Sequence, residues 1–168
     1  MPRAGSCSCS RHERTARPGR YGAAKPGETF VVSAASGVTG ALAKQHGCRV
    51  VGITGSPEKG AWLRELGFDA AVDRTTGDLG EALREVCPDG IDVYFDHVGG
   101  AVLDAALGNM ALFGRVAACG LLSVYDRDEP APGPARFDQI LMKWLTMTGF
   151  FSPDFYHHGP DLNRRLLP

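Results

Sequence analysis

The sequence predicts a single domain built on a doubly wound parallel α/β sheet of about six strands. Short apolar runs alternate with amphipathic stretches over about 120 residues. The apolar runs are continuous, as in strands that are buried on both faces. Such an alternation gives right-handed crossover connections and a parallel sheet. The length of 168 residues fits one domain.

Local signals place the individual elements. Gly47 stands in a helix-stop position, and Ser56 with Pro57 forms an N-cap followed by a residue suited to the first helical turn. In the helix that follows, Trp62, Leu63 and Leu66 fall on one face. The predicted strands are 28–34, 48–54, 70–73, 91–98, 114–120 and 146–151, and the predicted helices are 37–46, 56–67, 77–87, 101–111 and 136–145.

Charge and cysteine content argue against several classes of protein. Residues 1–25 carry six basic residues against Glu13 alone, a net charge of +5, so the rest of the chain carries −6. This mildly acidic body argues against a nucleic-acid-binding domain. No apolar run approaches the roughly 18 residues of a membrane helix. The five cysteines show no disulfide spacing, which favours a reducing, cytoplasmic setting, and no Cys/His cluster has zinc-ligand spacing.

Residues 1–27 differ from the rest of the chain. They are rich in Arg, Ser, Gly and Pro, and they lack both a periodic apolar pattern and the apolar stretch of a secretory signal. We interpret them as a disordered tail or a gene-boundary artefact, with an organellar targeting segment as the alternative. Residues 28–155 form the predicted folded domain, and 156–168 begin a truncated C-terminal segment.

The turn after the first strand carries a glycine pattern typical of dinucleotide sites. Ala34, Gly37 and Gly40 form the variant A-x-x-G-x-x-G between a strand and a helix. Gly37 would let the backbone approach a pyrophosphate, Gly40 would allow close helix packing, and the helix N-terminus would offer amides to phosphate. The alternative is a turn that merely needs glycine. In the first position of a βαβ array, we favour a Rossmann-type dinucleotide site.

The end of the second strand distinguishes the two nicotinamide cofactors. An NAD site places Asp or Glu about 20 residues beyond the fingerprint, where it binds the ribose 2′-hydroxyl. The corresponding segment 53–56 contains no acid. Its absence, with Ser56 as a donor and Lys59 one turn into the helix, favours NADP(H). Arg74 is a second candidate for the phosphate, although both cations could instead be solvated surface charges.

The ends of the fourth and fifth strands offer no clear catalytic group. Asp96 and His97 are adjacent in extended chain, so their side chains point oppositely and cannot form an acid–base pair. His97 fits a polar lid or a satisfied histidine better than a catalyst. Cys119 fits a buried structural cysteine better than a nucleophile. Tyr125 either lines the nicotinamide pocket or caps a loop.

These motifs together resemble the zinc-independent medium-chain dehydrogenase/reductases, over roughly residues 25–160. The runs are SAASGVTG, GCRVVGITGSPEK, LGFDAAVD, CPDGIDVYFDHVGG and FGRVAACG. Within that family the sequence looks most like the prostaglandin reductase, or leukotriene B4 12-hydroxydehydrogenase, branch, with curcumin-reductase-like bacterial relatives. The resemblance implies an NADP-dependent alkenal/one oxidoreductase that reduces the carbon–carbon double bond of α,β-unsaturated carbonyl compounds by hydride transfer.

The resemblance also implies cofactor contacts. Lys59 would pair with the 2′-phosphate of NADPH, and Arg74 stands where the family usually has Tyr but can meet the phosphate as a charge. His97 stands where the family usually has Asn, and Tyr125 would lie near the substrate pocket. No catalytic residue is assigned. The predicted cofactor-binding residues are Gly37, Val38, Thr39, Gly40, Ser56, Lys59, Arg74, His97, Cys119, Gly120, Tyr125, Phe150, Phe151 and Ser152.

The sequence departs from the family pattern in three ways. The helix after the fingerprint is about one turn shorter, the family's N-terminal GroES-like domain is absent, and the chain stops at Pro168 before the segment that returns to that domain. We therefore expect an isolated cofactor domain whose partners are a small enone or enal, the missing GroES-like domain and, through an apolar edge at 136–151, a second copy. The alternatives are a non-catalytic NADPH-binding module or fragment, and a quinone reductase of the same superfamily.

Overall fold

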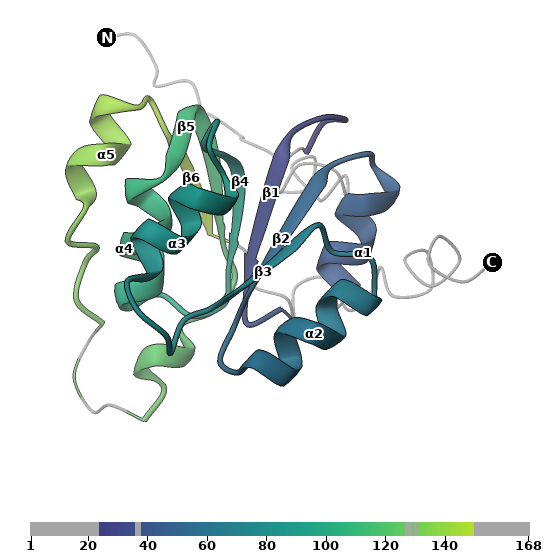
Figure 1. Ribbon diagram of the computed structural model, residues 1–168. Helices are drawn as coiled ribbons and strands as arrows, with labels where there is room; N and C mark the ends of the chain where they lie inside the picture. Colours follow the sequence, from purple (N-terminus) through teal and green to yellow (C-terminus); the bar gives the residue numbers. More distant parts are fainter. Residues whose placement is uncertain (1–23, 36–37, 127–128, 130, 150–168) are drawn as a thin grey trace, which may run out of the picture.

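A computed structural model describes residues 24–35, 38–126, 129 and 131–149, and its centre is a six-stranded sheet. The strand order is β3-β2-β1-β4-β5-β6, and every neighbouring pair is parallel (Figure 1). The predicted doubly wound sheet is therefore confirmed. The strands are β1 (Thr29–Ser33), β2 (Arg49–Thr54), β3 (Ala70–Asp73), β4 (Ile91–Asp96), β5 (Met110–Ala118) and β6 (Thr146–Gly149).

Helices cover the sheet on both faces. α1 and α2 lie on one face, and α3, α4 and α5 lie on the other (Figure 1). Each predicted helix is present, and a short 3-10 helix, η1, follows β5. No helix in the described part of the chain is both long and apolar enough to cross a membrane. The bounds are α1 (Val38–Gln45), α2 (Pro57–Glu65), α3 (Leu79–Val86), α4 (Gly100–Gly108), η1 (Leu122–Val124) and α5 (Phe137–Met142).

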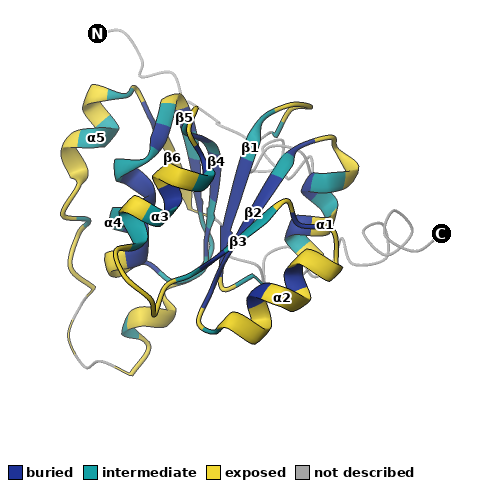
Figure 2. Ribbon diagram, viewed as in Figure 1, coloured by how far each residue is buried: buried dark blue, intermediate teal, exposed yellow. Residues whose placement is uncertain are grey.

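The central strands are buried on both faces, as their continuous apolar sequences predict. In β1, Phe30 and Val32 pack in the cluster that contains α1 and α2 residues, whereas Val31 packs in the cluster that contains α3 and α4 residues. All three are at most 5% exposed, and Figure 2 shows β1 in the colour of buried residues over most of its length. The alternation of side chains along one strand thus joins two separate apolar cores through the sheet.

The local signals for turns and caps are also confirmed. Gly47 adopts φ 79°, a left-handed conformation that suits glycine at a helix stop. The Ser56 hydroxyl accepts from the backbone N–H of Lys59, and Pro57 opens α2. Of the three apolar side chains predicted to share one face, Leu63 is buried, whereas Trp62 and Leu66 are each 46% exposed. Sharing one helix face therefore did not bring these three side chains into the core.

The start of β5 differs from the prediction. α4 ends at Gly108 and β5 begins at Met110, before the predicted start at residue 114. The pairing moves from Ile91 with Met110 to Val93 with Arg115, so residues 111–114 bulge out of the ladder. Phe113 has φ 62° and is exposed. An apolar run that bulges into solvent carries no periodic signal, which explains the misplaced boundary.

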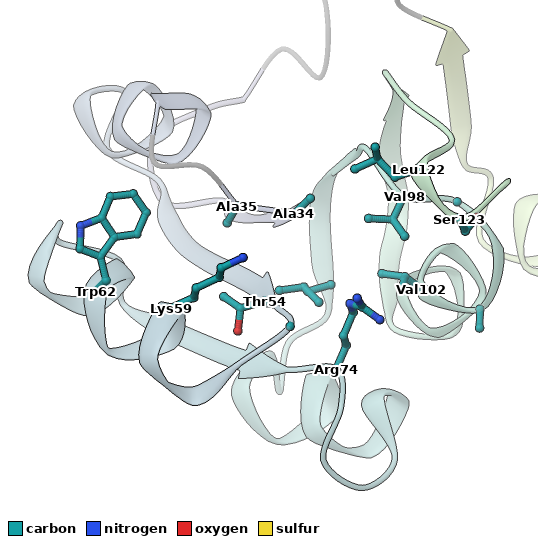
Figure 3. A pocket seen from close by; sticks show the side chains of 14 residues that line it. Ala34, Ala35, Thr54, Lys59, Trp62, Arg74, Val98, Val102, Leu122 and Ser123 are labelled. Atoms are coloured by element: carbon teal, nitrogen blue, oxygen red, sulfur yellow. The ribbon is translucent and has the colours of Figure 1, made fainter. Parts of the chain in front are cut away.

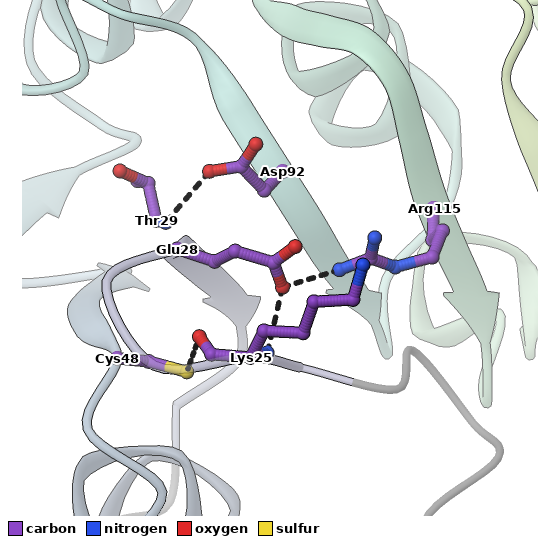
Figure 4. A network of polar contacts seen from close by, with 6 residues as sticks. All are labelled: Lys25, Glu28, Thr29, Cys48, Asp92 and Arg115. Carbon is purple, nitrogen blue, oxygen red and sulfur yellow. Dashed lines mark hydrogen bonds and ion pairs between the residues drawn. The ribbon is translucent and has the colours of Figure 1, made fainter.

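A network of polar contacts fastens the edge of the sheet where the strands begin, which we call the amino edge (Figure 4). The Glu28 carboxylate accepts from the backbone N–H of Lys25 at 2.7 Å and from the Arg115 guanidinium at 2.5 Å. The Asp92 carboxylate accepts from the backbone N–H of Thr29 at 2.8 Å. These contacts tie the segment that enters β1 to β4 and β5.

Candidate functional site

The opposite edge of the sheet, where the strands end, holds a pocket of about 720 Å³ (Figure 3). We call it the carboxyl edge. The volume lies in the range of small-molecule sites, and this edge is where ligands bind in open parallel sheets. The pocket lies where the strand order reverses, beside β1 and β4. It is lined by Ala34, Ala35, Ile53, Thr54, Gly55, Lys59, Trp62, Arg74, Val98, Gly99, Ala101, Val102, Leu122 and Ser123.

Two cations form one side of this pocket. Lys59 lies in the first turn of α2, where the Ser56 cap and Pro57 start the helix, and Arg74 directly follows β3. Arg74 lies against Gly55, since a Cβ added there would stand 3.4 Å from its Nη2. Neither cation forms an ion pair within 4 Å in the described part of the chain, and no Asp or Glu lines the pocket. This side therefore favours an anion.

An apolar wall forms the other side of the pocket. Val98, Gly99, Ala101 and Val102 come from the turn after β4 and the start of α4. Residues 122–123 belong to η1 after β5. Figure 3 shows Val98, Val102, Leu122 and Ser123 on the side of the pocket away from Trp62 and Lys59. Val98, Ala101 and Val102 could not be singled out from the sequence, because short apolar side chains at the start of a helix are common in any core.

The fingerprint turn is only partly described. Gly37 lies outside the described residues, whereas Ala34 lines the pocket. Val38 is exposed and Thr39 half-buried in the first turn of α1, and neither lines the pocket. Gly40 is buried against Phe68, because an added Cβ would lie 1.9 Å from the ring atom Cζ. The close packing expected at Gly40 is therefore present, with Phe68 before β3 as its partner.

The remaining predicted site residues lie away from the lining. Ser56 caps α2, and Tyr125 is 66% exposed just after η1. Gly120 packs on the carbonyl of His97, since an added Cβ would stand 2.8 Å from that oxygen. Phe150, Phe151 and Ser152 lie outside the described residues. Ser56, His97, Cys119, Gly120 and Tyr125 are not lining residues, so a direct cofactor contact by them stays a prediction.

His97 and Cys119 are not set up as reactive groups. The His97 ring packs on Phe95 with centroids 5.1 Å apart, on the side of the strand opposite the Asp96 carboxylate. Burial lowers the pKa of His97, so the ring is neutral at pH 7. Burial, with a smaller contribution from Asp96, raises the pKa of the Cys119 thiol. Cys119 therefore stays protonated at neutral pH, which favours its interpretation as a structural cysteine.

No metal centre is built by the residues that the structure describes. Among them, no group of three or more His, Cys, Asp or Glu side chains lies close enough together to hold an ion.

The fold and the pocket together define a Rossmann-type α/β domain, the class that binds nucleotides at the carboxyl edge beside the switch in strand order. Sequence comparison assigns this domain to a family. The chain belongs to the zinc-binding dehydrogenase family, whose model matches residues 36–166. This match confirms the family that the sequence motifs predicted, and the relatives below confirm the branch.

Curated relatives include prostaglandin reductase 1 of Bos taurus, 48% identical over 132 residues, covering 75% of this chain and 40% of the relative. The NADP(+)-dependent 2-alkenal reductase of Nicotiana tabacum is 44% identical over 150 residues, covering 86% and 43%. Among solved structures, CurA of Vibrio vulnificus in complex with NADPH has a TM-score of 0.78 and 37% identity, covering 87% and 46%. The chain thus spans less than half the length of these relatives.

Proposed function

We propose that this chain is the NADPH-binding part of a reductase that acts on the carbon–carbon double bond of α,β-unsaturated aldehydes and ketones. One observation carries the cofactor proposal: Lys59 and Arg74 converge on the pocket from α2 and β3, without a carboxylate in the lining. A 2′-phosphate needs positive charge at this place, whereas the ribose of NADH needs an acid. The names of the relatives support the choice of NADPH and of an enal or enone substrate.

The residues present fit this cofactor in three parts. Lys59 and Arg74 would bind the 2′-phosphate, and the amides at the start of α1 would bind the pyrophosphate. The wall formed by Val98, Ala101 and Val102 would cover the adenine ring and exclude water from it. When bound, NADPH supplies the hydride, so the role of this chain is to bind and orient the cofactor.

A titration of the full chain with NADPH, and with NADH in parallel, followed by nucleotide fluorescence, tests the cofactor proposal. We expect NADPH to bind at least about tenfold more tightly, which corresponds to about 1.4 kcal/mol. Equal affinity for the two nucleotides, or no binding of either, would overturn it.

A second assay tests the reaction. The bound chain is given an unsaturated ketone, an alkenal or a quinone, and NADPH oxidation is followed. Turnover with the ketone or alkenal supports the reductase, and turnover with the quinone alone supports the quinone reductase alternative. Binding without turnover supports the alternative of a non-catalytic NADPH-binding module.

We also propose that the chain works in a cytoplasmic setting. A separate proposal is that it pairs with a second copy through the outer edge of β6. All four residues of β6 are exposed at the end of the sheet, next to the exposed side chains of Leu141, Met142 and Trp144. Unpaired strand edges and apolar patches favour association. Light scattering across a concentration series is expected to give a dimer, and Met147→Lys, within the edge strand, is expected to give a monomer. A monomer for the unaltered chain at all concentrations would contradict this proposal.

A further inference from the structure

Asp96, at the end of β4, is a buried carboxylate that does not line the pocket. It is 1% exposed, and no ion pair with it occurs in the described part of the chain. Its Oδ1 accepts from the hydroxyls of Ser33 at 3.1 Å and Tyr94 at 2.9 Å, and from the backbone N–H groups of Val98 at 3.0 Å and Gly99 at 3.1 Å. A buried carboxyl group needs hydrogen-bond partners, so Asp96 and the groups that surround it hold one another in place.

The turn that Asp96 holds also fixes the segment after β5. The carbonyl of Asp96 accepts from the backbone N–H groups of Cys119 at 2.7 Å and Gly120 at 3.1 Å. The carbonyls of the next two residues accept from residues 122 and 123 at 3.1 and 3.0 Å. The contact is close, because a Cβ on Gly99 would stand 2.9 Å from Leu121 Cδ2.

These two segments, together with the first turn of α4, supply the apolar wall of the pocket. We propose that Asp96 is the positioning residue of this wall: its carboxylate fixes the turn 97–100 and, through it, residues 119–123, at the distance from Lys59 and Arg74 that a nucleotide needs. This inference rests on the proposed NADPH function. Asp96 acts through the backbone that it holds and does not touch the nucleotide.

The same strand offers a matched control. Asp92 also accepts a backbone N–H, from Thr29 at 2.8 Å, but it lies at the amino edge, away from the pocket. Removal of either carboxylate leaves its donors without this acceptor and lowers stability. Only the removal of Asp96 is expected to loosen the pocket wall.

The test uses the full chain with Asp96→Ala, Asp96→Asn and Asp92→Ala, each measured for NADPH affinity, thermal unfolding and amide hydrogen exchange. We expect Asp96→Ala to weaken NADPH binding about tenfold or more and to speed exchange at residues 98, 99, 122 and 123. Asp92→Ala is expected to lower the unfolding temperature without either change. Asp96→Asn keeps the acceptor at Oδ1 and loses only Oδ2, which shares the Gly99 N–H at 3.2 Å, so it is expected to restore affinity to within about threefold of the unaltered chain.

Three results would overturn the inference: unchanged affinity in a folded Asp96→Ala, an equal loss of affinity in Asp92→Ala, or no recovery of affinity in Asp96→Asn. If Asp96→Ala does not fold, Ser33→Ala replaces it. That change removes one donor to Asp96 and the acceptor that the backbone N–H of His97 uses at 2.8 Å. It is expected to weaken NADPH binding about threefold and to speed exchange at residues 97–99, and no effect on either measurement overturns the inference.

Failure of the proposed function is visible separately. It appears as absent NADPH binding by the unaltered chain, before any variant is made. The exchange rates at residues 98, 99, 122 and 123 need no nucleotide, so they still show whether Asp96 holds the wall.

Discussion

At the amino edge of the sheet, Glu28 and Asp92 accept from the segment that enters β1, and Arg115 completes an ion pair with Glu28. At the carboxyl edge, Asp96 accepts from a turn that leaves β4 and from side chains on β1 and β4. Both edges thus use carboxylates to hold backbone amides. They differ in that Arg115 at the amino edge is paired, whereas Lys59 and Arg74 at the carboxyl edge form no ion pair within the described residues.

Stability and nucleotide binding therefore depend on different edges of the sheet. The two charges of an ion pair largely cancel, so the pair attracts a charged ligand only weakly. Cations without a carboxylate partner retain their attraction for an anion. The amino edge should therefore tolerate changes without loss of nucleotide affinity, and the carboxyl edge should not.

The largest expected effect is a difference in unfolding free energy between alanine substitutions at two helical glycines, one at each edge of the sheet. Gly40 lies in the first turn of α1 at the carboxyl edge, where an added Cβ would stand 1.9 Å from Phe68 Cζ. Gly108 ends α4 at the amino edge and has nothing within 4 Å of such an atom. We expect Gly40→Ala to lose about 3 kcal/mol of unfolding free energy through overpacking, and Gly108→Ala to be neutral or to gain up to about 1 kcal/mol. Urea unfolding measures both, and equal values would show that Phe68 moves aside freely.

The next largest effect is expected when a substitution breaks the ion pair of the amino edge. Glu28→Gln leaves the half-buried guanidinium of Arg115 with a weaker acceptor, so we expect a loss of about 2 kcal/mol of unfolding free energy. Lys44→Ala is the control, since the Lys44–Asp69 pair is exposed and contributes under about 1 kcal/mol. Chemical denaturation gives both values. NADPH affinity should not change in either variant, and a tenfold loss in Glu28→Gln would contradict the separation of the two edges.

A smaller effect concerns the cations of the pocket. We expect Lys59→Ala to raise the Kd for NADPH about tenfold, or about 1.4 kcal/mol, while the Kd for NADH stays the same. Arg74→Ala should act in the same direction. Lys44→Ala again serves as the control, because it removes a lysine outside the pocket lining. A parallel loss for NADH would show that Lys59 holds a part shared by both nucleotides.

The smallest effect is the pH dependence of stability from His97. Burial lowers its pKa in the folded chain, so the unfolded chain binds the proton more readily. Its contribution is complete above the unfolded pKa of about 6.5 and declines as the pH falls below that value. We expect thermal unfolding temperatures to fall less between pH 7.5 and pH 5.5 in His97→Asn than in the unaltered chain. Asp69, whose pKa is lowered from 3.8, stays ionised across this window and does not contribute. Equal slopes would contradict the assignment to His97.

Most of the fold could be predicted because it depends on local patterns. Continuous apolar runs such as the one that forms β1 indicate strands that are buried on both faces. Ser56 with Pro57 indicates the start of α2. The start of β5 could not be predicted in this way. Leu112 and Phe113 are apolar yet exposed, because the bulge turns them out of the ladder.

The site was predictable where it depends on the fingerprint turn, which contributes Ala34 to the lining, and on charge. Lys59 and Arg74 stand out in the sequence because segment 53–56, where an NAD site places its acid, contains none. Leu122 and Trp62 also line the pocket, but tertiary contacts alone bring them there. Asp96 was noticed in the sequence only for pointing away from His97, since nothing in the sequence shows that four donors meet at its carboxylate.

The pairing of β1 with β4 also sets the order in which the chain can fold. Both the Thr29–Asp92 and the Ser33–Asp96 bonds join residues that are 63 positions apart. At about 5–20 residues per second, a ribosome needs roughly 3 to 13 seconds to deliver the second partner after the first. Throughout that interval a nascent β1-β2-β3 unit exposes an unpaired hydrogen-bonding edge at β1. The centre of the finished sheet is therefore the place where a growing chain is most open to aggregation and to capture by a chaperone.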